Sequence, residues 1–494
     1  MTSPISKTYI LRTLGCKANV YDTQQIEAEL KKRGFRPAAK GELAGLCIIN
    51  SCTVTDEADR QSRKLAGRLS RENPQATIVV TGCAAEVDPE RLSHSSGIHY
   101  IIGNRDKPKL VDLILFEMTR SGRDSCSQAA RLLGRVEPYS QMASRHPKAT
   151  ATAMDREWPM NSEVFAMGEY SAKTRAFLKI QEGCNSFCTY CIIPYGRGPS
   201  RSLASDQVIA QISTLVHEGV REIVLTGTNI GDYEDDLPEK GLAELVERIL
   251  QETRLERLRV SSLAPTEITA KILEILDGSS GRFCPHFHVS LQSPHAGTLR
   301  RMKRRYGPDE IRNVLSRLSS RNGVDGGVFI GMDVITGFPG ESESDFEEGL
   351  RFLAALPWTR LHVFPYSERA GTPAVRLPGV VPREERARRA KVLNAMSLER
   401  MTAWHRAVLE SCQASGRPLQ GILLESASRK FGTSGESTGG HTLGYTPNYI
   451  RVAVSAQRTA LRSNQIVSAY PSDLVVDSRA GEVVLLAETV EERY

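Results

Sequence analysis

The sequence predicts an α/β protein with three domains: an N-terminal doubly wound parallel sheet, a central barrel-like parallel sheet, and a small antiparallel β-barrel at the C-terminus. Three observations predict this class. The chain has 494 residues, enough for about three domains. Short apolar runs alternate with helical stretches through most of the chain, which is typical of βαβ units. From about residue 418 the pattern changes to short runs of period two, which favours an all-β unit.

The first predicted domain covers residues 7–118. Its predicted strands are Tyr9–Leu14, Leu46–Asn50, Thr77–Thr81 and His99–Ile102, and its predicted helices cover about 21–33, 56–72, 86–93 and 106–118. Strands and helices in alternation indicate a small doubly wound sheet. Residues 119–172 mix Ser, Arg, Ala, Met and Pro without periodicity. Because a loop of this length is improbable within one domain, we expect an interdomain linker there.

The second predicted domain covers residues 173–412. Its predicted strands are Phe177–Gln181, Glu222–Thr226, Leu258–Ser262, His286–Leu291, Val328–Ile335 and Leu361–Phe364, and its predicted helices cover about 205–218, 241–253, 266–278, 308–321 and 343–355. Six strand–helix units are too few for an eight-stranded barrel, so they predict a partial (β/α)6 barrel. One charged helix is expected over residues 383–412.

The third predicted domain covers residues 413–494. Its period-two runs are Ile422–Glu425, Tyr449–Val454, Gln465–Ala469 and Glu482–Ala487, which indicate a small all-β barrel.

The composition excludes several classes of protein. With 40% hydrophobic and 25% charged residues, the chain is neither disordered nor fibrous. No run approaches the ~18 consecutive apolar residues of a membrane helix, and the first residues lack the core of a signal peptide. We therefore expect a cytoplasmic protein without a membrane partner. The net charge of +6 is compatible with a nucleic-acid partner and is too small to indicate one by itself.

Three of the ten cysteines form the most specific motif in the chain. Cys184, Cys188 and Cys191 are spaced Cys-x3-Cys-x2-Cys directly after a predicted strand. Three thiolates this close can surround one metal cluster, whereas three unpaired structural cysteines would be the simpler alternative. A zinc site would normally require a fourth Cys or His nearby, and none lies within about twenty residues. Three ligands leave one iron of a [4Fe–4S] cluster open to a further ligand.

A second set of cysteines, Cys16, Cys52 and Cys83, is distributed over the first domain. Each one follows a predicted parallel strand. Because ligands bind at the carboxyl edge of open α/β sheets, the three side chains are expected to converge into a second cluster site. Gly15 and Gly82 directly precede two of them and permit close approach of the backbone. The other four cysteines are expected to be structural: Cys47, Cys126, Cys284 and Cys412.

The Cys184–Cys191 motif resembles that of the radical S-adenosylmethionine superfamily, in which an aromatic residue precedes the third cysteine, as Tyr190 does here. The two cysteine sets together resemble the methylthiotransferase family of that superfamily, over nearly the whole chain. The match includes Gly15-Cys16-Lys17-Ala18-Asn19, although Ser51 stands where Thr is usual. The resemblance implies an auxiliary cluster held by the Cys16 set, a radical-SAM barrel, and a C-terminal RNA-binding barrel of the TRAM type.

Several stretches are most similar to the branch of this family that acts on threonylcarbamoyladenosine in tRNA. They include residues 181–184, 192–198, 225–231 and 444–452, while Ser293-Pro294-His295 departs from the family pattern. The resemblance implies a transferase that adds a methylthio group to C2 of this adenosine beside the anticodon. It implies two [4Fe–4S] clusters and S-adenosylmethionine as cofactors. The implied partners are tRNA, an electron donor of the flavodoxin or ferredoxin type, and a sulfur source.

Further site residues are expected at the carboxyl ends of the central strands and in basic regions. The candidates for binding S-adenosylmethionine, which also suit plain turns, are Tyr190, Gly227, Thr228, Asn229, Ser261, Ser262, Gln292 and Asp333. The candidates for binding RNA are Arg300, Arg301, Lys303, Arg304 and Arg305 in one run, and Tyr445, Tyr449, Arg451, Arg458 and Arg462 in the last domain. The alternatives are a solvated helix face for the run and an ordinary barrel surface for the rest.

Two other functions compete with this interpretation. The same chemistry on isopentenyladenosine in tRNA, or on an aspartate of a ribosomal protein, is the nearer alternative. A non-catalytic RNA-binding protein with a zinc or iron–sulfur structural element is an alternative from a different class.

Overall fold

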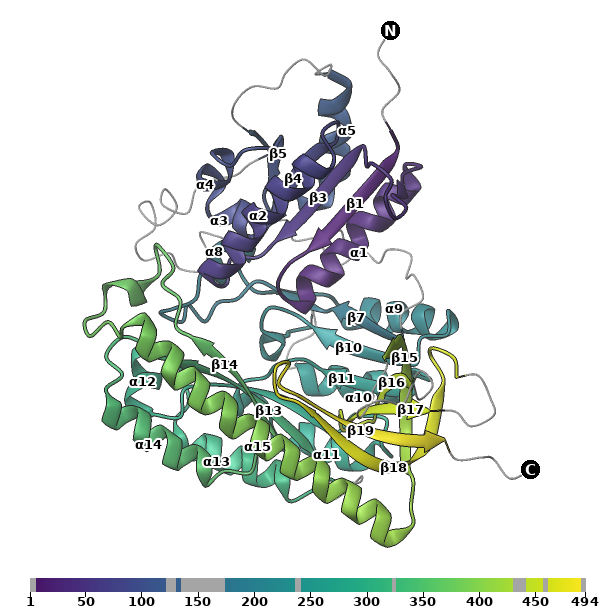
Figure 1. Cartoon of the computed structure of the whole chain (residues 1–494), viewed down its shortest axis with the longest axis vertical. Coiled ribbons are helices and arrows are strands. Elements are labelled where there is room, and N and C mark those ends of the chain that lie inside the picture. Colours follow the sequence, from purple (N-terminus) through teal and green to yellow (C-terminus); the bar gives the residue numbers. More distant parts are fainter. Residues whose placement is uncertain are drawn as a thin grey trace, which may run out of the picture.

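The computed structural model describes residues 6–120, 130–134, 174–235, 241–321, 326–429, 441–455 and 461–489. The described residues form three successive units, and Figure 1 shows the N-terminal sheet standing over the central strands, with the C-terminal barrel beside them.

The N-terminal unit is one six-stranded parallel sheet. Its strand order is β2-β1-β3-β4-β5-β6, with β1 (Thr8–Thr13), β2 (Arg36–Pro37), β3 (Leu46–Ser51), β4 (Thr77–Gly82), β5 (Tyr100–Ile102) and β6 (Arg131–Leu133). Strand β6 pairs in parallel with β5, so the sheet extends into the segment expected to be a linker. The rest of that predicted linker, residues 121–129 and 135–172, lies outside the described residues.

Helices cover both faces of this sheet, as the doubly wound prediction requires. Successive residues of β3 point to opposite faces: Cys47 and Ile49 pack on one side, and Leu46 and Ile48 on the other. The first side is covered by α2 (Asp56–Glu72), α3 (Cys83–Val87) and α4 (Pro89–Ser93), and the second by α1 (Lys17–Lys32) and α5 (Leu110–Arg120), which follows the short 3-10 turn η1 (Lys107–Lys109).

The start of α1 differs from the prediction and matters for the site. The helix was expected from about residue 21, yet it begins at Lys17, directly after Cys16. Cys16 occupies the N-cap position and makes no capping hydrogen bond, so the Ser, Thr or Asp that usually marks a helix start is missing from the sequence. Helix α2, by contrast, is capped by the Thr55 side chain, which accepts a bond from the Ala58 amide, and its predicted bounds are correct.

The central unit contains six parallel strands in two three-stranded sheets, β11-β10-β7 and β12-β13-β14. Isolated parallel bridges, Leu258 to Phe283 and Leu263 to Val289, connect the two sheets. The strands are β7 (Arg175–Lys179), β10 (Glu222–Thr226), β11 (Arg257–Val260), β12 (His286–Gln292), β13 (Phe329–Thr336) and β14 (Arg360–Pro365). The helices are α9 (Ser205–His217), α10 (Leu242–Glu252), α11 (Ala270–Gly278), α12 (Ala296–Arg301), α13 (Pro308–Ser319) and α14 (Glu343–Ala354).

The C-terminal unit is a closed five-stranded barrel that follows the long helix α15 (Arg383–Ser415). Its order is β15-β16-β17-β19-β18, with β15 (Leu419–Arg429), β16 (His441–Tyr445), β17 (Arg451–Ser455), β18 (Ile466–Asp477) and β19 (Glu482–Thr489). Strand β16 was not predicted. The barrel is also not wholly antiparallel, because β17 and β19 pair in parallel. Tyr449, expected within a strand, has φ +68° and lies in the turn before β17.

Buried arginines attach this barrel to the amino ends of the central strands. Arg257 donates to the carbonyl oxygens of Gly421 at 2.9 Å and Thr446 at 2.9 Å. Arg257 and Arg259 also pair with the fully buried Glu222 at 2.8 and 3.1 Å. Burial opposes ionisation of Glu222, yet Arg259 and Arg257 outweigh it and lower its pKa to about 2. The barrel is therefore fixed to the central unit by guanidinium groups that pair with Glu222 and also donate to carbonyl oxygens of the barrel.

Within the described part of the chain, no helix combines the length and the apolar character that a membrane crossing requires.

Candidate functional site

The cysteines of the first predicted set meet at the carboxyl edge of the N-terminal sheet. Cys16 directly precedes α1, Cys52 follows β3, and Cys83 opens α3 after β4. Strands β1, β3 and β4 are adjacent and parallel, so these three ends share one edge. Cys52 and Cys83 are buried, whereas Cys16 is exposed. The sheet thus places the three thiols at one edge.

Contacts around Gly15 show how closely these thiols approach. Gly15 has φ +95°, and a Cβ atom there would lie 2.7 Å from Cys52 Sγ. Burial raises the pKa of Cys52 to about 12, and the nearby Cys83 and Cys16 act in the same direction. Thiols that oppose one another's ionisation suit a cationic centre that takes up their combined charge.

Replacing Gly15 with Ala should destabilise the N-terminal domain. The new methyl group would lie 2.6 Å from Cys52 Cβ, and the residue would keep a left-handed φ. We expect the free energy of unfolding, measured by urea denaturation, to fall by about 3 kcal/mol. Gly41→Ala is the matched control, because Gly41 has φ +86° and no atom within 4 Å, so it reports backbone strain alone, about 1–2 kcal/mol. Equal losses in both variants would contradict crowding by Cys52.

The cysteines of the second predicted set face one cavity in the central unit. Cys184, Cys188 and Cys191 lie between β8 (Gln181–Glu182) and α8 (Ile193–Arg197) and line a cavity of about 270 Å³. Burial raises the pKa of Cys191 to about 12, and Cys188 and Cys184 act in the same direction. Among the described residues, no group of three His, Cys, Asp or Glu side chains forms a site for a single metal ion.

The structure sorts the predicted cofactor-binding residues into two groups. The residues that line the cavity are Tyr190, Thr228, Asn229 and Gln292. The other four predicted residues do not line this cavity: Gly227, Ser261, Ser262 and Asp333. Asp333 lies in the middle of β13 instead, with its carboxylate 2.8 Å from His288 Nε2. The lining also contains Asp232 and Glu267, two acidic residues that were not predicted.

The basic run 300–305 was predicted to bind RNA, with a solvated helix face as the alternative, and the structure places its members in different environments. Arg304 turns inward, where its Nη1 lies 3.2 Å from Cys188 Sγ and its Nε donates to the Tyr306 hydroxyl at 2.9 Å. Lys303 and Arg305 line the same cavity. Of the other two, Arg301 donates to the Thr298 hydroxyl at 3.0 Å and Arg300 is exposed. Most of this run therefore forms part of the wall of the Cys184–Cys191 cavity.

The predicted RNA-binding residues of the C-terminal barrel fall into separate environments. Tyr445 and Tyr449 stack on each other with ring centroids 4.7 Å apart and contact Arg175 of the central unit. Arg451 pairs with Glu482 of β19. Arg462 is exposed, and Arg458 lies outside the described residues. The two tyrosines therefore belong to the interface between barrel and central unit, so they are not on an open barrel surface.

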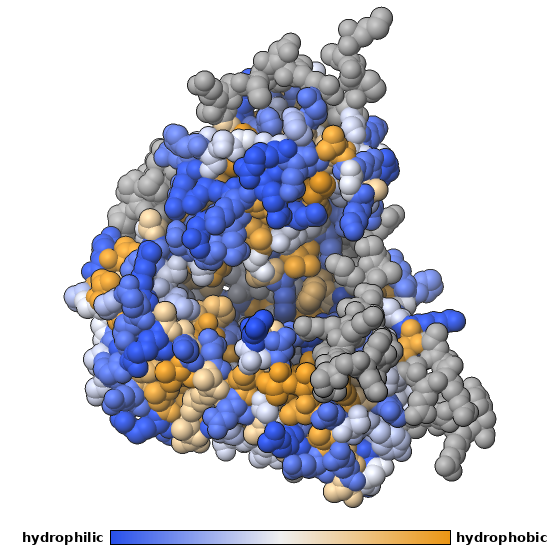
Figure 2. Space-filling view, viewed as in Figure 1, coloured by the Kyte–Doolittle hydropathy of each residue, from blue (hydrophilic) through white to orange (hydrophobic). Residues whose placement is uncertain are grey.

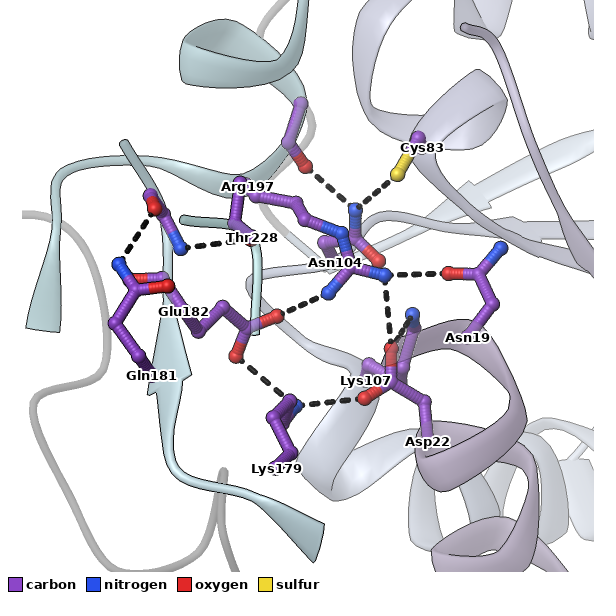
Figure 3. Close-up of polar contacts among 12 residues, drawn as sticks. Asn19, Asp22, Cys83, Asn104, Lys107, Lys179, Gln181, Glu182, Arg197 and Thr228 are labelled. Atoms are coloured by element: carbon purple, nitrogen blue, oxygen red, sulfur yellow. Dashed lines mark hydrogen bonds and ion pairs between the residues drawn. The ribbon is translucent and has the colours of Figure 1, made fainter. Parts of the chain in front are cut away.

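A buried network of charges, not predicted from the sequence, joins the N-terminal and central units (Figure 3). Asp22 of α1 accepts bonds from Lys179 at 2.6 Å, Lys107 at 2.9 Å and Arg197 at 3.2 Å. Burial opposes ionisation of Asp22, but Lys107, Lys179 and Arg197 together hold its pKa well below its usual range. Asp22 is therefore an ionised carboxylate in the interior.

Glu182 is the second carboxylate of this network. It accepts from Arg197 at 2.6 Å and from Lys179 at 3.1 Å, and Arg201 lies 3.1 Å away. With Lys107, four cations share two carboxylates, so the network carries excess positive charge. The sequence signal for it was a lysine, Lys179, inside an otherwise apolar predicted strand, because a buried charge requires a partner.

The network touches the Cys16–Cys52–Cys83 site directly. Arg197 donates to the Asn19 side chain, three residues after Cys16. Burial opposes protonation of Arg197, but Cys83, Asp22, Glu182 and Cys16 hold its pKa well above its usual range. An excess of buried positive charge beside three thiols suits a centre that is net negative once its thiolate ligands are counted.

A short helix connects the two cysteine sites. Helix α8 begins two residues after Cys191 and packs on α3, whose first residue is Cys83. A Cβ atom at Gly196 of α8 would lie 3.5 Å from Cys83 Cβ. Asn104 donates both to the Gly196 carbonyl and, at 3.5 Å, to Cys83 Sγ (Figure 3). The relative position of the two sites is thus set by direct packing.

Comparison with known families gives two matches. Residues 8–103 match the uncharacterized protein family UPF0004, and residues 178–353 match the radical SAM superfamily. These ranges contain all six cysteines of the two sites.

Curated relatives match over most of the chain. The threonylcarbamoyladenosine tRNA methylthiotransferase MtaB of Bacillus subtilis is 33% identical over 452 residues, which cover 90% of each chain. The protein of the same name from Aquifex aeolicus is 32% identical and covers 84% of this chain and 92% of its own. Among solved structures, the radical S-adenosylmethionine methyltransferase TsrM of Kitasatospora setae has a TM-score of 0.51 at 14% identity, covering 73% of this chain and 72% of that chain. This likeness concerns the fold alone.

Proposed function

Because the chain belongs to the radical S-adenosylmethionine methylthiotransferase family, we propose that it adds a methylthio group to C2 of N6-threonylcarbamoyladenosine in tRNA, beside the anticodon. The names of its relatives specify this substrate. The observation that carries the proposal is the packing of two three-cysteine sites against each other through α3 and α8. One site suits radical generation, and the other is close enough to supply sulfur to the same base.

The cofactors of this family are S-adenosylmethionine and two [4Fe–4S] clusters. We assign Cys184, Cys188 and Cys191 to the radical cluster and the Cys16 set to the auxiliary cluster. Three thiols that share one cavity, with Arg304 beside Cys188, fit a cluster whose fourth iron is open to the methionyl group. When bound, these groups supply the 5′-deoxyadenosyl radical and the methylated sulfur that the reaction requires.

The chain's own residues then bind and orient the cofactor. Lys303 and Arg305 suit the methionyl carboxylate, and Asp232 and Glu267 suit the ammonium. Gln292 supplies hydrogen-bonding groups at the carboxyl end of β12, with φ +63°. Tyr190 lies behind the cysteine loop, with its ring edge-on to Phe338 at 6.4 Å. This packing holds the loop in place and shields the cavity on that side.

The partners of this reaction follow from its chemistry. A tRNA substrate agrees with the names of the relatives. We propose that the central strands form a partial barrel and that the C-terminal barrel is TRAM-like and binds RNA, with the exposed Arg300 and Arg462 among the phosphate contacts. Radical generation requires an electron donor of the flavodoxin or ferredoxin type, and the transferred sulfur requires a source.

Nucleoside analysis of tRNA tests the substrate. In a strain lacking this chain, mass spectrometry should show unmethylthiolated threonylcarbamoyladenosine in place of its 2-methylthio derivative, and expression of the chain should restore the derivative. Loss of the 2-methylthio form of isopentenyladenosine instead would assign the chain to the other tRNA substrate. An unchanged nucleoside profile would exclude a tRNA substrate altogether.

Replacing Arg304 with Gln should make the radical cluster harder to reduce. The guanidinium lies 3.2 Å from Cys188 Sγ and favours added negative charge on the cluster. We expect the midpoint potential, measured by EPR-monitored titration, to fall on the order of 100 mV, an energy of about 2 kcal/mol. Arg300→Gln, which removes an exposed charge in the same run, is the control. An equal shift in both variants would contradict the role of the Arg304 contact.

A further inference from the structure

The Lys17 side chain projects from the Cys16 site toward the interior enclosed by the central strands. It is the first residue of α1, whose first turn faces β7 and β10 in Figure 1. Lys17 is exposed to solvent. Tyr449 and Asp333, from the C-terminal barrel and β13, lie within electrostatic range of the amine. The ammonium therefore lies in an open recess, and Figure 2 shows a hollow between the N-terminal unit and the central strands.

The Lys17 ammonium makes no hydrogen bond or ion pair with any residue that the structure describes. The carboxylates of the recess are paired elsewhere. Asp333 lies 2.8 Å from His288, and Glu425 lies 2.5 Å from Arg175. Arg175 and Arg259 lie within electrostatic range of this ammonium, so the local potential is positive and attracts an anionic ligand.

The floor of the recess adds to the positive potential around Lys17. The Arg175 guanidinium lies over the Tyr445 ring at 4.8 Å and donates to the Tyr449 hydroxyl at 3.4 Å. The Arg259 guanidinium lies 5.0 Å from the centre of the Tyr449 ring. Burial opposes ionisation of Tyr449, but Arg175, Lys17 and Arg259 outweigh it and lower its pKa. The floor is thus a packed aromatic platform held by two guanidinium groups, and it favours an anion above it.

The proposed substrate carries one group of the required charge on the required edge. Its threonyl substituent ends in a carboxylate and is attached through N6 of the adenine. Position N6 lies on the same edge of the base as C2, with only N1 and C6 between them in the ring. Since Lys17 follows Cys16 directly, an anion held by Lys17 keeps this edge beside the auxiliary cysteines.

We propose that Lys17 binds the carboxylate of the threonylcarbamoyl group, and that this ion pair orients C2 of the base toward the Cys16–Cys52–Cys83 site. This inference rests on the proposed function. Lys17 is then a specificity residue: it recognises the negatively charged substituent and gives no corresponding contact to a neutral one such as isopentenyl.

Equilibrium binding of tRNA to the reconstituted holoenzyme tests the proposal. The probes are one tRNA with threonylcarbamoyladenosine beside the anticodon and the same tRNA with unmodified adenosine. The wild-type chain should prefer the modified tRNA by about tenfold or more, as expected for a charge-assisted hydrogen bond. Lys17→Met should bring this ratio close to one without changing affinity for unmodified tRNA, and Lys17→Arg should retain most of it. Lys17→Glu should invert the preference.

Two controls separate this inference from its premise. Lys32→Met, at the exposed far end of α1, should leave the preference unchanged. Iron content and S-adenosylmethionine cleavage without tRNA are measured for every variant, so that loss of a cluster is distinguished from loss of the tRNA preference. A wild-type preference that survives both Lys17→Met and Lys17→Glu would overturn the role of Lys17 and leave the proposed function standing. Methylthiolation of isopentenyladenosine alone by the wild-type chain would overturn the proposed function, and the inference with it.

Discussion

Replacing Cys188 with Ala should abolish formation of 5′-deoxyadenosine while the auxiliary site keeps its cluster. Cys188 is buried, lies between the other two cysteines of its motif and contacts Arg304, so its removal leaves the assigned cluster site with two thiols. We expect iron content to fall to roughly four atoms per chain, the content of one [4Fe–4S] cluster. Cleavage of S-adenosylmethionine under reducing conditions should fall by at least about 10³-fold, because it requires the site-bound cluster.

Cys47→Ala is the matched control for this variant. Cys47 is fully buried in β3, with its side chain in the core and away from both cysteine sites. Its loss should cost about 1 kcal/mol of stability and leave iron content and cleavage unchanged. If the Cys188 variant still produces 5′-deoxyadenosine, the assignment of Cys184, Cys188 and Cys191 as ligands is wrong.

Replacing Asp22 with Ala should cost about 3–5 kcal/mol of unfolding free energy, because it leaves buried cations without their shared partner. Lys107, Lys179 and Arg197 all bond to this carboxylate, and only Glu182 would remain to balance them. The loss should appear in urea denaturation at neutral pH. Since the pKa of Asp22 is lowered in the fold, the wild-type contribution persists above its ordinary value of 3.8 and is lost as the pH falls below it.

Asp112→Ala provides the comparison for Asp22. Asp112 pairs with Arg33 at 2.7 Å, but the pair is largely exposed, so its removal should change stability by no more than about 1 kcal/mol. Asp22→Ala should also lower retention of the auxiliary cluster, because Arg197 would lose one of its two carboxylate partners beside Cys83. A loss no larger than that of Asp112→Ala would show that the buried network does not hold the two units together.

The two sets of cysteines, and the strands that precede them, could be identified from the sequence for a physical reason. Apolar runs and helical periodicity are local properties, and parallel strands place successive carboxyl ends at one edge. The convergence of Cys16, Cys52 and Cys83 therefore followed once three strands were assigned to one sheet. The apolar run around Cys47 likewise predicted its burial, which is confirmed, and Cys284 and Cys412, also expected to be structural, are buried as well. Cys126, the fourth expected structural cysteine, lies outside the described residues.

The charge network was not predictable in the same way. Asp22 and Arg197 are 175 positions apart, and no local pattern relates a carboxylate on one domain to a guanidinium on another. Arg304 shows a second limit of prediction from the sequence. A dense run of cations is usually a solvated face, and only the tertiary structure shows that one member turns toward Cys188. Strand β16 was missed because Gly444 and polar residues interrupt its apolar pattern.

The arginine contacts between the central unit and the C-terminal barrel have a consequence for biosynthesis. Arg257 and Arg259 are translated more than 150 residues before the carbonyl groups of Gly421, Tyr445, Thr446 and Pro447 that they bind. While the ribosome is still making the barrel, β11 therefore carries two guanidinium groups that lack their final carbonyl acceptors. The contact between the central unit and the barrel therefore forms only after the barrel segments have been made. Until then Glu222 is the partner of both guanidinium groups within the central unit, so this charge cluster can form before the barrel docks on it.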